Sequence, residues 1–423
     1  MDTIFALSSG QPPAGIGVIR VTGPQAVVAL ETIAGRVPEP RRATRAVFRD
    51  VSRETLDDGL VVFFPGPKSV TGEDLVEFHC HGGRAVIAAV ESSLGEIAGC
   101  RRAEPGEFTR RAFANGRIDL SEAEGLADLL SAETEIQRRS AMAMMGGALS
   151  RRVEGWREEL LRLSAQVEAV LDFDDEDDVA ALPVSFNRSL SSLHTALCDA
   201  LEAPYAETLR EGFRVALAGP PNAGKSTLFN ALVESEAAIT ADIAGTTRDI
   251  LSQSVAIAGV PFTFVDMAGL RDESGDQIEN IGIARARDEI AKADLVLWLG
   301  PEGEGPEGSW EIAAQADREK LHKTESDFRV SAVTGQGMDS LREALLETAR
   351  SAMPRHGSAA LNARQRDRLA EAARALAAAQ EEDDPLLVAE NLRRTRQAFD
   401  ALVGRTSTED VLDALFGRFC IGK

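Results

Sequence analysis

The sequence predicts a multidomain protein of mixed class, α/β plus all-α. The chain has 423 residues, more than one ordinary hydrophobic core holds. Short apolar runs typical of strands fill most of the first third, and long amphipathic patterns begin at Ser121. From residue 211 to about residue 352, strands alternate with helices. Because helical patterns flank this second α/β region, we expect it to be inserted into one helical domain. The expected domain bounds are 1–118, 119–210, 211–353 and 354–423.

The first region is expected to form an α/β domain. Apolar runs bounded by glycine, proline or serine indicate strands at residues 3–9, 15–23 and 59–67. Residues 74–83 alternate apolar and polar side chains, as in a half-buried strand that ends in a glycine turn. Residues 85–99 repeat their apolar positions every 3.6 residues, which predicts a helix.

Long helices are expected next. Ser121 and Glu124 have the spacing of a capping box, which predicts the start of one helix over residues 121–145. A second helix is predicted over residues 156–173, and it runs into the acidic residues 172–179. We interpret this acidic stretch as a solvated loop or helix end rather than as a metal site, because adjacent carboxylates diverge unless a backbone turn gathers them.

The inserted region has the order of a parallel sheet with crossover helices. Strands are predicted at residues 213–220, 261–269 and 294–300, and a helix at residues 224–233. The chain then returns to helices, which are predicted at residues 364–380 and 390–404.

Composition limits the classes of function. The chain is 44% hydrophobic and 27% charged, with a net charge of −22. Such a charge opposes non-specific adhesion to nucleic acid, so RNA contact would need a local basic patch or a more basic partner. No stretch reaches the roughly 18–20 apolar residues of a membrane span, and the N-terminus does not resemble a secretory signal. The four cysteines, Cys80, Cys100, Cys198 and Cys420, are widely spaced, which favours a reducing cytoplasm.

A phosphate-binding loop is the strongest motif. "GPPNAGKST" fits Gly-x-x-x-x-Gly-Lys-Ser/Thr from Gly219 to Ser226, and it follows a predicted strand and opens a predicted helix. Such a loop turns its N–H groups inward, where the helix N-terminus also favours phosphate. Lys225 is expected to reach the β and γ oxygens and Ser226 to bind Mg²⁺. The alternative, a tight glycine turn that binds nothing, fits this context poorly.

Two further segments follow in the order of a nucleotide switch. In "ADIAGTTRD", Thr247 is expected to complete the Mg²⁺ shell. In "VDMAG", Asp266 ends a strand and the Gly269 N–H faces the γ-phosphate. The next residue, Leu270, has no polar atom, although Ras-like switches carry a water-orienting glutamine there. Hydrolysis would therefore need another group.

Base recognition departs from the usual pattern. Guanine-specific members of this class carry Asn-Lys-x-Asp, whereas this chain reads "AQAD", with Ala314 in place of asparagine and Asp317 retained. "SAVTG" begins at Ser331 and could offer a backbone N–H to the guanine carbonyl. We expect guanine to be preferred over adenine. The alternative for Asp317 is a helix cap.

Taken together, "GPPNAGKST", "DIAGTTRD", "DMAGL", "TGEDLVEFHCHGG" and the last five residues, "FCIGK", resemble the tRNA-modification GTPase family called MnmE or TrmE. The resemblance covers nearly the whole chain. It implies an N-terminal α/β folate-binding domain, a helical domain and an inserted Ras-like P-loop GTPase domain.

The resemblance also implies how hydrolysis proceeds without a glutamine. Members of the family use K⁺ as an internal substitute for an arginine finger, and Asn222, Ala241, Ile243 and Thr246 correspond to its site. Glu279 corresponds to a carboxylate that positions water; its alternative is an exposed helix residue. The implied GTP-binding residues are Asn222, Ala223, Gly224, Lys225, Ser226, Thr227, Ala241, Asp242, Ile243, Ala244, Gly245, Thr246, Thr247, Asp266, Met267, Ala268, Gly269, Asp317, Ser331 and Ala332.

The resemblance further implies a folate site and partners. Arg20, Glu77, Arg117 and Lys423 correspond to the site for 5-formyl- or 5,10-methylene-tetrahydrofolate, although Arg117 is usually lysine. Cys420 is a candidate nucleophile or acid/base, or else a buried small apolar residue. In "HCHGG", a turn near the folate pocket is favoured over a metal site.

The family works as a homodimer with a flavoprotein of the MnmG (GidA) type, which holds FAD, and modifies C5 of the wobble uridine of tRNA. One alternative is a regulatory RNA-binding or assembly GTPase switch. Another is a folate-dependent transferase with a decayed GTPase site.

Overall fold

A computed structural model describes residues 2–172, 182–202, 206–233, 251–267, 289–318, 323–353, 360–406 and 409–422. The chain divides into two compact units, one made of Met1–Ala127, Ser150–Arg157 and Arg396–Lys423, the other of Asp128–Leu149 and Glu158–Thr395. Over the described ranges, no helix combines the length and apolar character needed to cross a bilayer.

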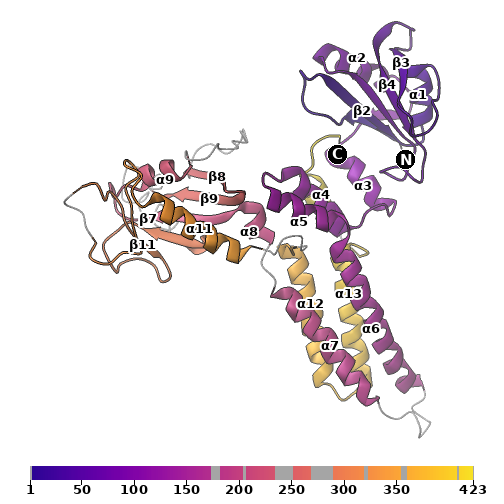
Figure 1. The fold of residues 1–423 in the computed structure, drawn as a ribbon. Helices are drawn as coiled ribbons and strands as arrows, with labels where there is room; N and C mark the ends of the chain where they lie inside the picture. Colours follow the sequence, from indigo (N-terminus) through magenta and orange to yellow (C-terminus); the bar gives the residue numbers. More distant parts are fainter. Residues whose placement is uncertain are drawn as a thin grey trace, which may run out of the picture. The chain divides into compact units, whose positions relative to one another are not determined.

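The N-terminal part of the first unit is a six-stranded sheet with the strand order β3-β4-β5-β2-β1-β6 (Figure 1). All neighbours pair antiparallel except β1 and β6, which are parallel. The strands are β1 Thr3–Leu7, β2 Ile16–Thr22, β3 Thr44–Arg49, β4 Thr55–Phe64, β5 Leu75–His81 and β6 Cys100–Arg102. The strands predicted near residues 3, 15, 59 and 74 are confirmed, whereas β3 and β6 were not predicted.

One face of this sheet is covered by α1 (Ala26–Ala34) and α2 (Arg84–Gly95). The core contains Phe5, Ile19 and Phe78 beneath side chains of both helices. Since successive strand residues point to opposite faces, Arg20 and Glu77 lie on the other face. The helix predicted at 85–99 is confirmed, with an earlier end.

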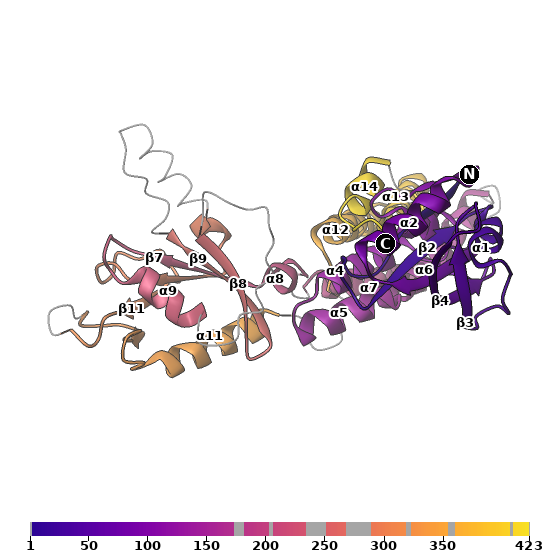
Figure 2. The ribbon, with the colours of Figure 1, turned by 90° about the horizontal axis from the view of Figure 1, so that it is seen from above.

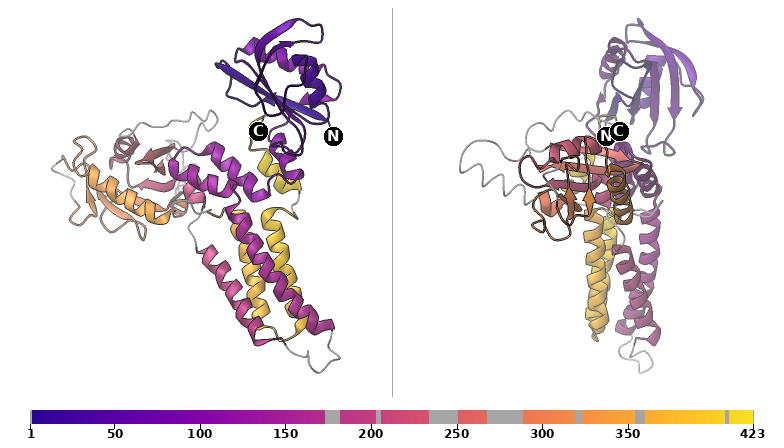
Figure 3. Two further views of the ribbon diagram at one scale, coloured as in Figure 1. Left: turned by 45° about the vertical axis from the view of Figure 1, so that its right-hand side comes forward. Right: turned by 60° about the vertical axis from the view of Figure 1, so that its left-hand side comes forward.

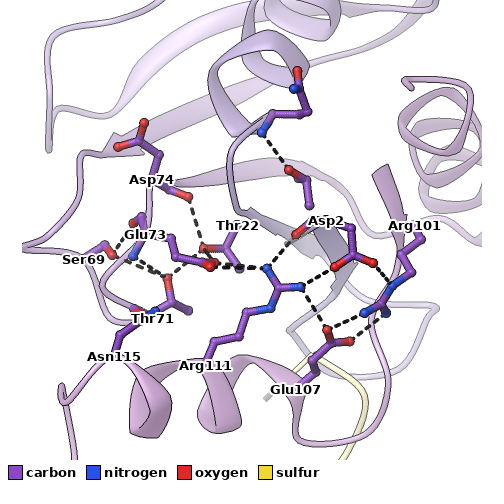
Figure 4. A network of polar contacts seen from close by, with 12 residues as sticks. Asp2, Thr22, Ser69, Thr71, Glu73, Asp74, Arg101, Glu107, Arg111 and Asn115 are labelled. Carbon is purple, nitrogen blue, oxygen red and sulfur yellow. Dashed lines mark hydrogen bonds and ion pairs between the residues drawn. The ribbon is translucent and has the colours of Figure 1, made fainter. Parts of the chain in front are cut away.

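A network of charged and hydroxyl side chains joins α3 (Glu107–Ala114) to the edge of the sheet (Figure 4). The Arg111 guanidinium donates to Glu73 at 3.2 Å and to Glu107 at 3.0 Å. Thr22 and Thr71 share a buried hydrogen bond of 2.7 Å. The Arg111–Glu107 pair is local, at i and i+4 of α3, but Glu73, Thr22 and Thr71 come from other segments, so no local pattern could predict the whole network.

Two predictions about the helix at 121–145 are wrong. The chain forms α4 (Leu120–Ser131) and α5 (Glu135–Met145), and Thr134 caps α5 through a capping box with Gln137. Thr134 needs an extended backbone as the cap residue, so the helix must break before it.

The cap of α4 is also not the predicted one. The Glu122 N–H donates to Asp119 Oδ1 at 2.8 Å, and the Asp119 N–H donates to Glu122 Oε2 at 2.9 Å. Ser121 lies inside the helix, and its buried hydroxyl donates to the Leu402 carbonyl at 3.3 Å. The box therefore begins two residues earlier than its sequence pattern suggested.

Helices form over the stretches predicted at 156–173, 364–380 and 390–404, with shifted bounds, whereas the helices over Val184–Leu201 and Glu409–Phe416 were not predicted. Within the first unit, Trp156 stacks on Phe399 at 6.0 Å, and Phe416 of the last helix packs with Phe113 and Phe419. The acidic residues 173–179 lie outside the described residues. The helices are α6 Ala148–Asp172, α7 Val184–Leu201, α12 Ala363–Glu381, α13 Pro385–Val403 and α14 Glu409–Phe416.

The second unit contains a six-stranded sheet with the order β12-β11-β10-β7-β9-β8 (Figure 2). Only β8 runs antiparallel to its neighbour. Side chains of α9 and α11 pack on the same face and share one apolar core with Phe213, Phe262 and Phe264. The elements are α8 Ala206–Glu211, β7 Phe213–Ala218, α9 Lys225–Val233, β8 Leu251–Ile257, β9 Val260–Asp266, β10 Leu295–Trp298, β11 Trp310–Ala313, β12 Phe328–Arg329 and α11 Met338–Ala352.

The observed class is therefore the predicted one, α/β parts combined with helices. The strand predictions at 213–220, 261–269 and 294–300 and the helix at 224–233 are confirmed. Figure 3 presents the elements of both units from two further sides.

Candidate functional site

The phosphate loop connects β7, in the middle of its sheet, to α9. Gly219 and Gly224 have φ of 143° and 92°, and Asn222 has φ of 63°. A Cβ on Gly219 would lie 2.9 Å from the Gly300 nitrogen, so this position requires glycine. Asparagine is one of the few residues that tolerate the left-handed region, which explains how Asn222 fits here.

Lys225 and Ser226 lie where the motif requires them. Lys225 Nζ donates to the carbonyls of Gly219 and Pro220 at 2.9 and 2.8 Å. Its side chain thus folds back over the loop that would hold the phosphates. To reach β and γ oxygens, the ammonium would exchange two carbonyl acceptors for charged ones, which form stronger hydrogen bonds.

The two described Mg²⁺ candidates meet directly. Ser226 Oγ donates to Asp266 Oδ2 at 2.6 Å, and Asp266 is buried at the end of β9. A hydroxyl and a carboxylate this close are the oxygen donors that Mg²⁺ prefers, so the residues fit the ion. The ion would neutralise phosphate charge when bound.

A pocket opens beside these groups. Its lining joins the phosphate loop and the start of α9 to the end of β9 and to the turn after β11. The lining residues are Gly219, Pro221, Asn222, Gly224, Lys225, Ser226, Thr227, Met267, Gln315 and Arg318. The chain therefore gathers two further segments around one anion-binding loop.

The base-side residues adjoin the same loop. Ser331 Oγ donates to Asp317 Oδ1 at 2.7 Å, and this hydrogen bond is the main reason why the pKa of Asp317 lies below its usual range. Asp317 lies in a turn, and no described helix begins at it. A second pocket here is lined by Gly224, Thr227, Leu228, Ala314, Gln315, Asp317, Arg318, Val330, Ala332 and Val333. Asp317 and Ala332 are thus brought together, and Ala223 packs against the domain core.

Several predicted residues lie outside the described residues. These include all the potassium ligands except Asn222, as well as the third Mg²⁺ ligand and the water-positioning glutamate. They are Ala241, Asp242, Ile243, Ala244, Gly245, Thr246, Thr247, Ala268, Gly269, Leu270, Glu279 and Lys423.

On the N-terminal sheet, Arg20 and Glu77 are direct cross-strand partners. Arg20 Nε donates to Glu77 Oε1 at 2.9 Å, and His79 Nε2 lies 3.2 Å from Glu77 Oε2. The hydrogen bond with His79, followed by that with Arg20, lowers the pKa of Glu77. Each carboxylate oxygen retains a second lone pair, so Glu77 could still accept from a bound ligand.

Arg117 approaches from the segment after α3. A Cβ on Gly72 would lie 3.3 Å from Arg117 Cγ, so the two chain segments touch. Among the described residues, no hydrogen bond or ion pair joins Arg117 to Arg20 or Glu77. The three predicted folate residues therefore occupy one domain without forming one bonded group.

The histidines of "HCHGG" each pair with a carboxylate. His79 adjoins Glu77, and His81 Nδ1 lies 2.8 Å from Asp57 Oδ1. Across the described part of the chain, no group of three histidine, cysteine, aspartate or glutamate residues is placed to hold a metal ion.

The C-terminal segment lies against the first unit's sheet. Ile421 pairs with Pro105, and Ser8 Oγ donates to the Gly422 carbonyl at 2.8 Å. Gly422 has φ of 96°, and a Cβ there would lie 2.2 Å from the Leu7 oxygen. Cys420 is exposed, so the alternative of a buried small apolar residue is wrong.

Sequence reasoning missed two residues of the nucleotide site, Gln315 and Arg318. Both line the phosphate-side and the base-side pockets. Their positions directly around Asp317 were the available signal.

A glycine-rich loop between a central parallel strand and a helix, with Ser226 on Asp266 and Asp317 on Ser331, defines a P-loop GTP-binding protein. Two family models also match, the model "GTP-binding protein TrmE N-terminus" over residues 3–117 and the model "MnmE helical domain" over residues 120–420.

The chain is similar throughout to curated tRNA modification GTPases named MnmE. It is 64% identical to that of Novosphingobium aromaticivorans and 60% identical to that of Erythrobacter litoralis, covering 100% of both chains in each case. It is 55% identical to that of Rhizorhabdus wittichii, over 100% of this chain and 97% of the relative. The chain belongs to the MnmE (TrmE) family, which confirms the resemblance drawn from its motifs. It is a tRNA modification GTPase, and its Ser226 and Asp266 fit a Mg²⁺ ion.

Proposed function

We propose that this GTPase is activated by K⁺ and acts with an FAD-carrying flavoprotein of the MnmG type. Together they would modify C5 of the wobble uridine, position 34, of tRNAs in the cytoplasm. The one-carbon donor would be 5,10-methylene-tetrahydrofolate, for which 5-formyl-tetrahydrofolate is a stand-in. The product would carry a carboxymethylaminomethyl or aminomethyl group.

The position of Asn222 supports potassium activation. It lies on the rim of the phosphate pocket and is held in the left-handed region at φ of 63°. Gln315 Nε2 donates to its carbonyl at 3.2 Å, which restrains the loop from outside. A cation held by Asn222 would offset charge on the phosphates, as an arginine does in other GTPases.

The open face of the N-terminal sheet supports a homodimer and a folate site. Ile16 is 62% exposed and Leu60 is 44% exposed, beside the Arg20–Glu77 pair. Exposed apolar side chains around charged groups are typical of a surface that a partner covers. Glu77 would accept from the pterin N–H edge, Arg20 and Arg117 would balance the folate carboxylates, and Cys420 would supply a thiol.

Steady-state GTP hydrolysis in matched K⁺ and Na⁺ buffers tests potassium activation. We expect strong stimulation by K⁺, with Asn222→Ala losing most of it. Equal rates in the two salts would contradict the proposal.

Wobble-uridine analysis of tRNA from cells that lack the protein tests the modification. An unchanged nucleoside profile would instead favour a regulatory GTPase switch. Binding of 5-formyl-tetrahydrofolate to the purified chain tests the folate site separately.

A further inference from the structure

The base-reading motif lacks its first residue, because Ala314 stands where asparagine is usual. Asp317 can accept from the N1 and N2 groups of guanine, but an alanine methyl offers no donor. The other edge of guanine presents two acceptors, O6 and N7. The backbone N–H of "SAVTG" can donate to O6, but the two motifs leave N7 without a donor, so another residue is needed to read that edge in full.

Gln315 connects the turn after β11 to the phosphate loop. Its Nε2 donates to the Asn222 carbonyl at 3.2 Å, and the same atom would lie 3.1 Å from a Cβ on Gly224. The residue itself adopts the left-handed region, with φ of 59°. The hydrogen bond to the Asn222 carbonyl therefore fixes the position of the Gln315 amide beside the phosphate loop.

Arg318 makes two hydrogen bonds to Gln315. Its Nη1 donates to Gln315 Oε1 at 3.2 Å, and its backbone N–H donates to the Gln315 carbonyl at 2.9 Å. The side chain lines both the phosphate-side and the base-side pockets, next to Asp317. The amide nitrogen of Gln315 thus bonds to the phosphate loop, and its amide oxygen bonds to the Arg318 guanidinium beside the base-side pocket.

We propose that Arg318 determines guanine specificity in this chain by donating to O6 and N7, with Gln315 as its positioning residue. A guanidinium fork matches these two acceptors. Adenine presents an amino donor at the same edge, which would face the cation without an acceptor, so the contact discriminates against ATP. This inference rests on the GTP site described above. In it, Arg318 takes the role of the missing asparagine, four positions after Ala314.

Removing single acceptors from the ligand tests the contact. Binding of GDP, 7-deaza-GDP and ADP to the full chain with Mg²⁺ would be measured by calorimetry. For the wild type, we expect loss of N7 to weaken binding about tenfold, as for other bidentate arginine contacts. In Arg318→Ala, GDP should bind about tenfold more weakly, and the 7-deaza penalty should fall below about twofold.

Two further variants keep the test specific. Gln315→Ala should reduce the 7-deaza penalty, because Arg318 loses its anchor. Ala314→Asn added to Arg318→Ala should restore the preference for GDP over ADP. Arg350→Ala, an exposed arginine of α11 outside both pockets, is the matched control and should behave as wild type.

The opposing outcomes are distinct. If Arg318→Ala weakens GDP, 7-deaza-GDP and ADP by the same factor, Arg318 binds phosphate and the proposal is wrong. The proposal also fails if the variant leaves GDP affinity unchanged, or if the 7-deaza penalty persists in it. A wild-type chain without saturable GDP binding would overturn the GTP site itself, whereas GDP binding with an unaltered 7-deaza penalty overturns only the assignment of Arg318.

Discussion

The phosphate loop and the Arg20–Glu77 pair, which we propose contacts folate, are built in different ways. The loop takes its essential residues from one stretch, Gly219–Thr227, and its form follows from local backbone geometry. Arg20 and Glu77 lie 57 residues apart and meet only through the register of β2 and β5. The first kind of site can be identified from spacing alone, whereas the second requires the sheet.

The same comparison predicts that damage to each site stays separate. A local loop can lose its ligand contacts without disturbing a sheet in another compact unit. Mutations in either site should therefore change one binding activity and leave the other intact.

The largest effect is expected for Lys225→Ala. Its ammonium is the one charged group of the loop, so its loss should lower GTP turnover more than about 100-fold. Folate binding should be unchanged. Lys292→Ala, which removes an exposed lysine paired with Glu289, is the control and should hydrolyse GTP normally. If Lys225→Ala hydrolysed GTP within a few-fold of the wild-type rate, the phosphate loop would not depend on this lysine, and the prediction would be wrong.

Glu77→Gln should act on the other site alone. The amide would replace a carboxylate that accepts from Arg20 and His79, and it would present a donor as well as an acceptor to the ligand. We expect 5-formyl-tetrahydrofolate to bind about tenfold more weakly, since charge-assisted bonds contribute about 1.5–3 kcal/mol. GTP hydrolysis should not change.

The matched control for this substitution is Glu91→Gln on α2, whose carboxylate pairs with Arg102 and is similarly sheltered. It should bind folate as wild type does. Equal folate affinity in wild type and Glu77→Gln would remove Glu77 from the site and leave the sheet face to other residues.

How much could be predicted follows from the same distinction. Lys225, Ser226, Asp266 and Asp317 could be placed from spacing, because strand ends and a glycine loop determine their surroundings. The contact of Gln315 with the Asn222 carbonyl could not, since its partner is 93 residues away. The break before Thr134 was hidden because residues 121–145 keep a helical apolar period across it, and the cap of α5 prevails locally.

The pH dependence of stability tests the ion pairs of Glu77 on the N-terminal sheet. The pKa of Glu77 is lowered in the folded protein, so its ion pairs stabilise the fold above the unfolded-state pKa and are lost as pH falls through the folded value. At pH 7 the wild type should be more stable than Glu77→Gln by about 1 kcal/mol. Urea unfolding repeated at decreasing pH should show this difference shrink below pH 4.5, the ordinary value. A difference that grows on acidification would contradict the sign.

The smallest effect tests the corrected helix start. Asp119 and Glu122 exchange two hydrogen bonds at the start of α4, so Asp119→Ala should cost about 1 kcal/mol of unfolding free energy. Glu124 belongs to the predicted box that does not form, so Glu124→Ala should cost less unfolding free energy than Asp119→Ala. Urea unfolding of both variants provides the measurement. If Glu124→Ala were the more damaging, the helix would begin where its sequence pattern suggested, and a local motif would have been sufficient here as it was for the phosphate loop.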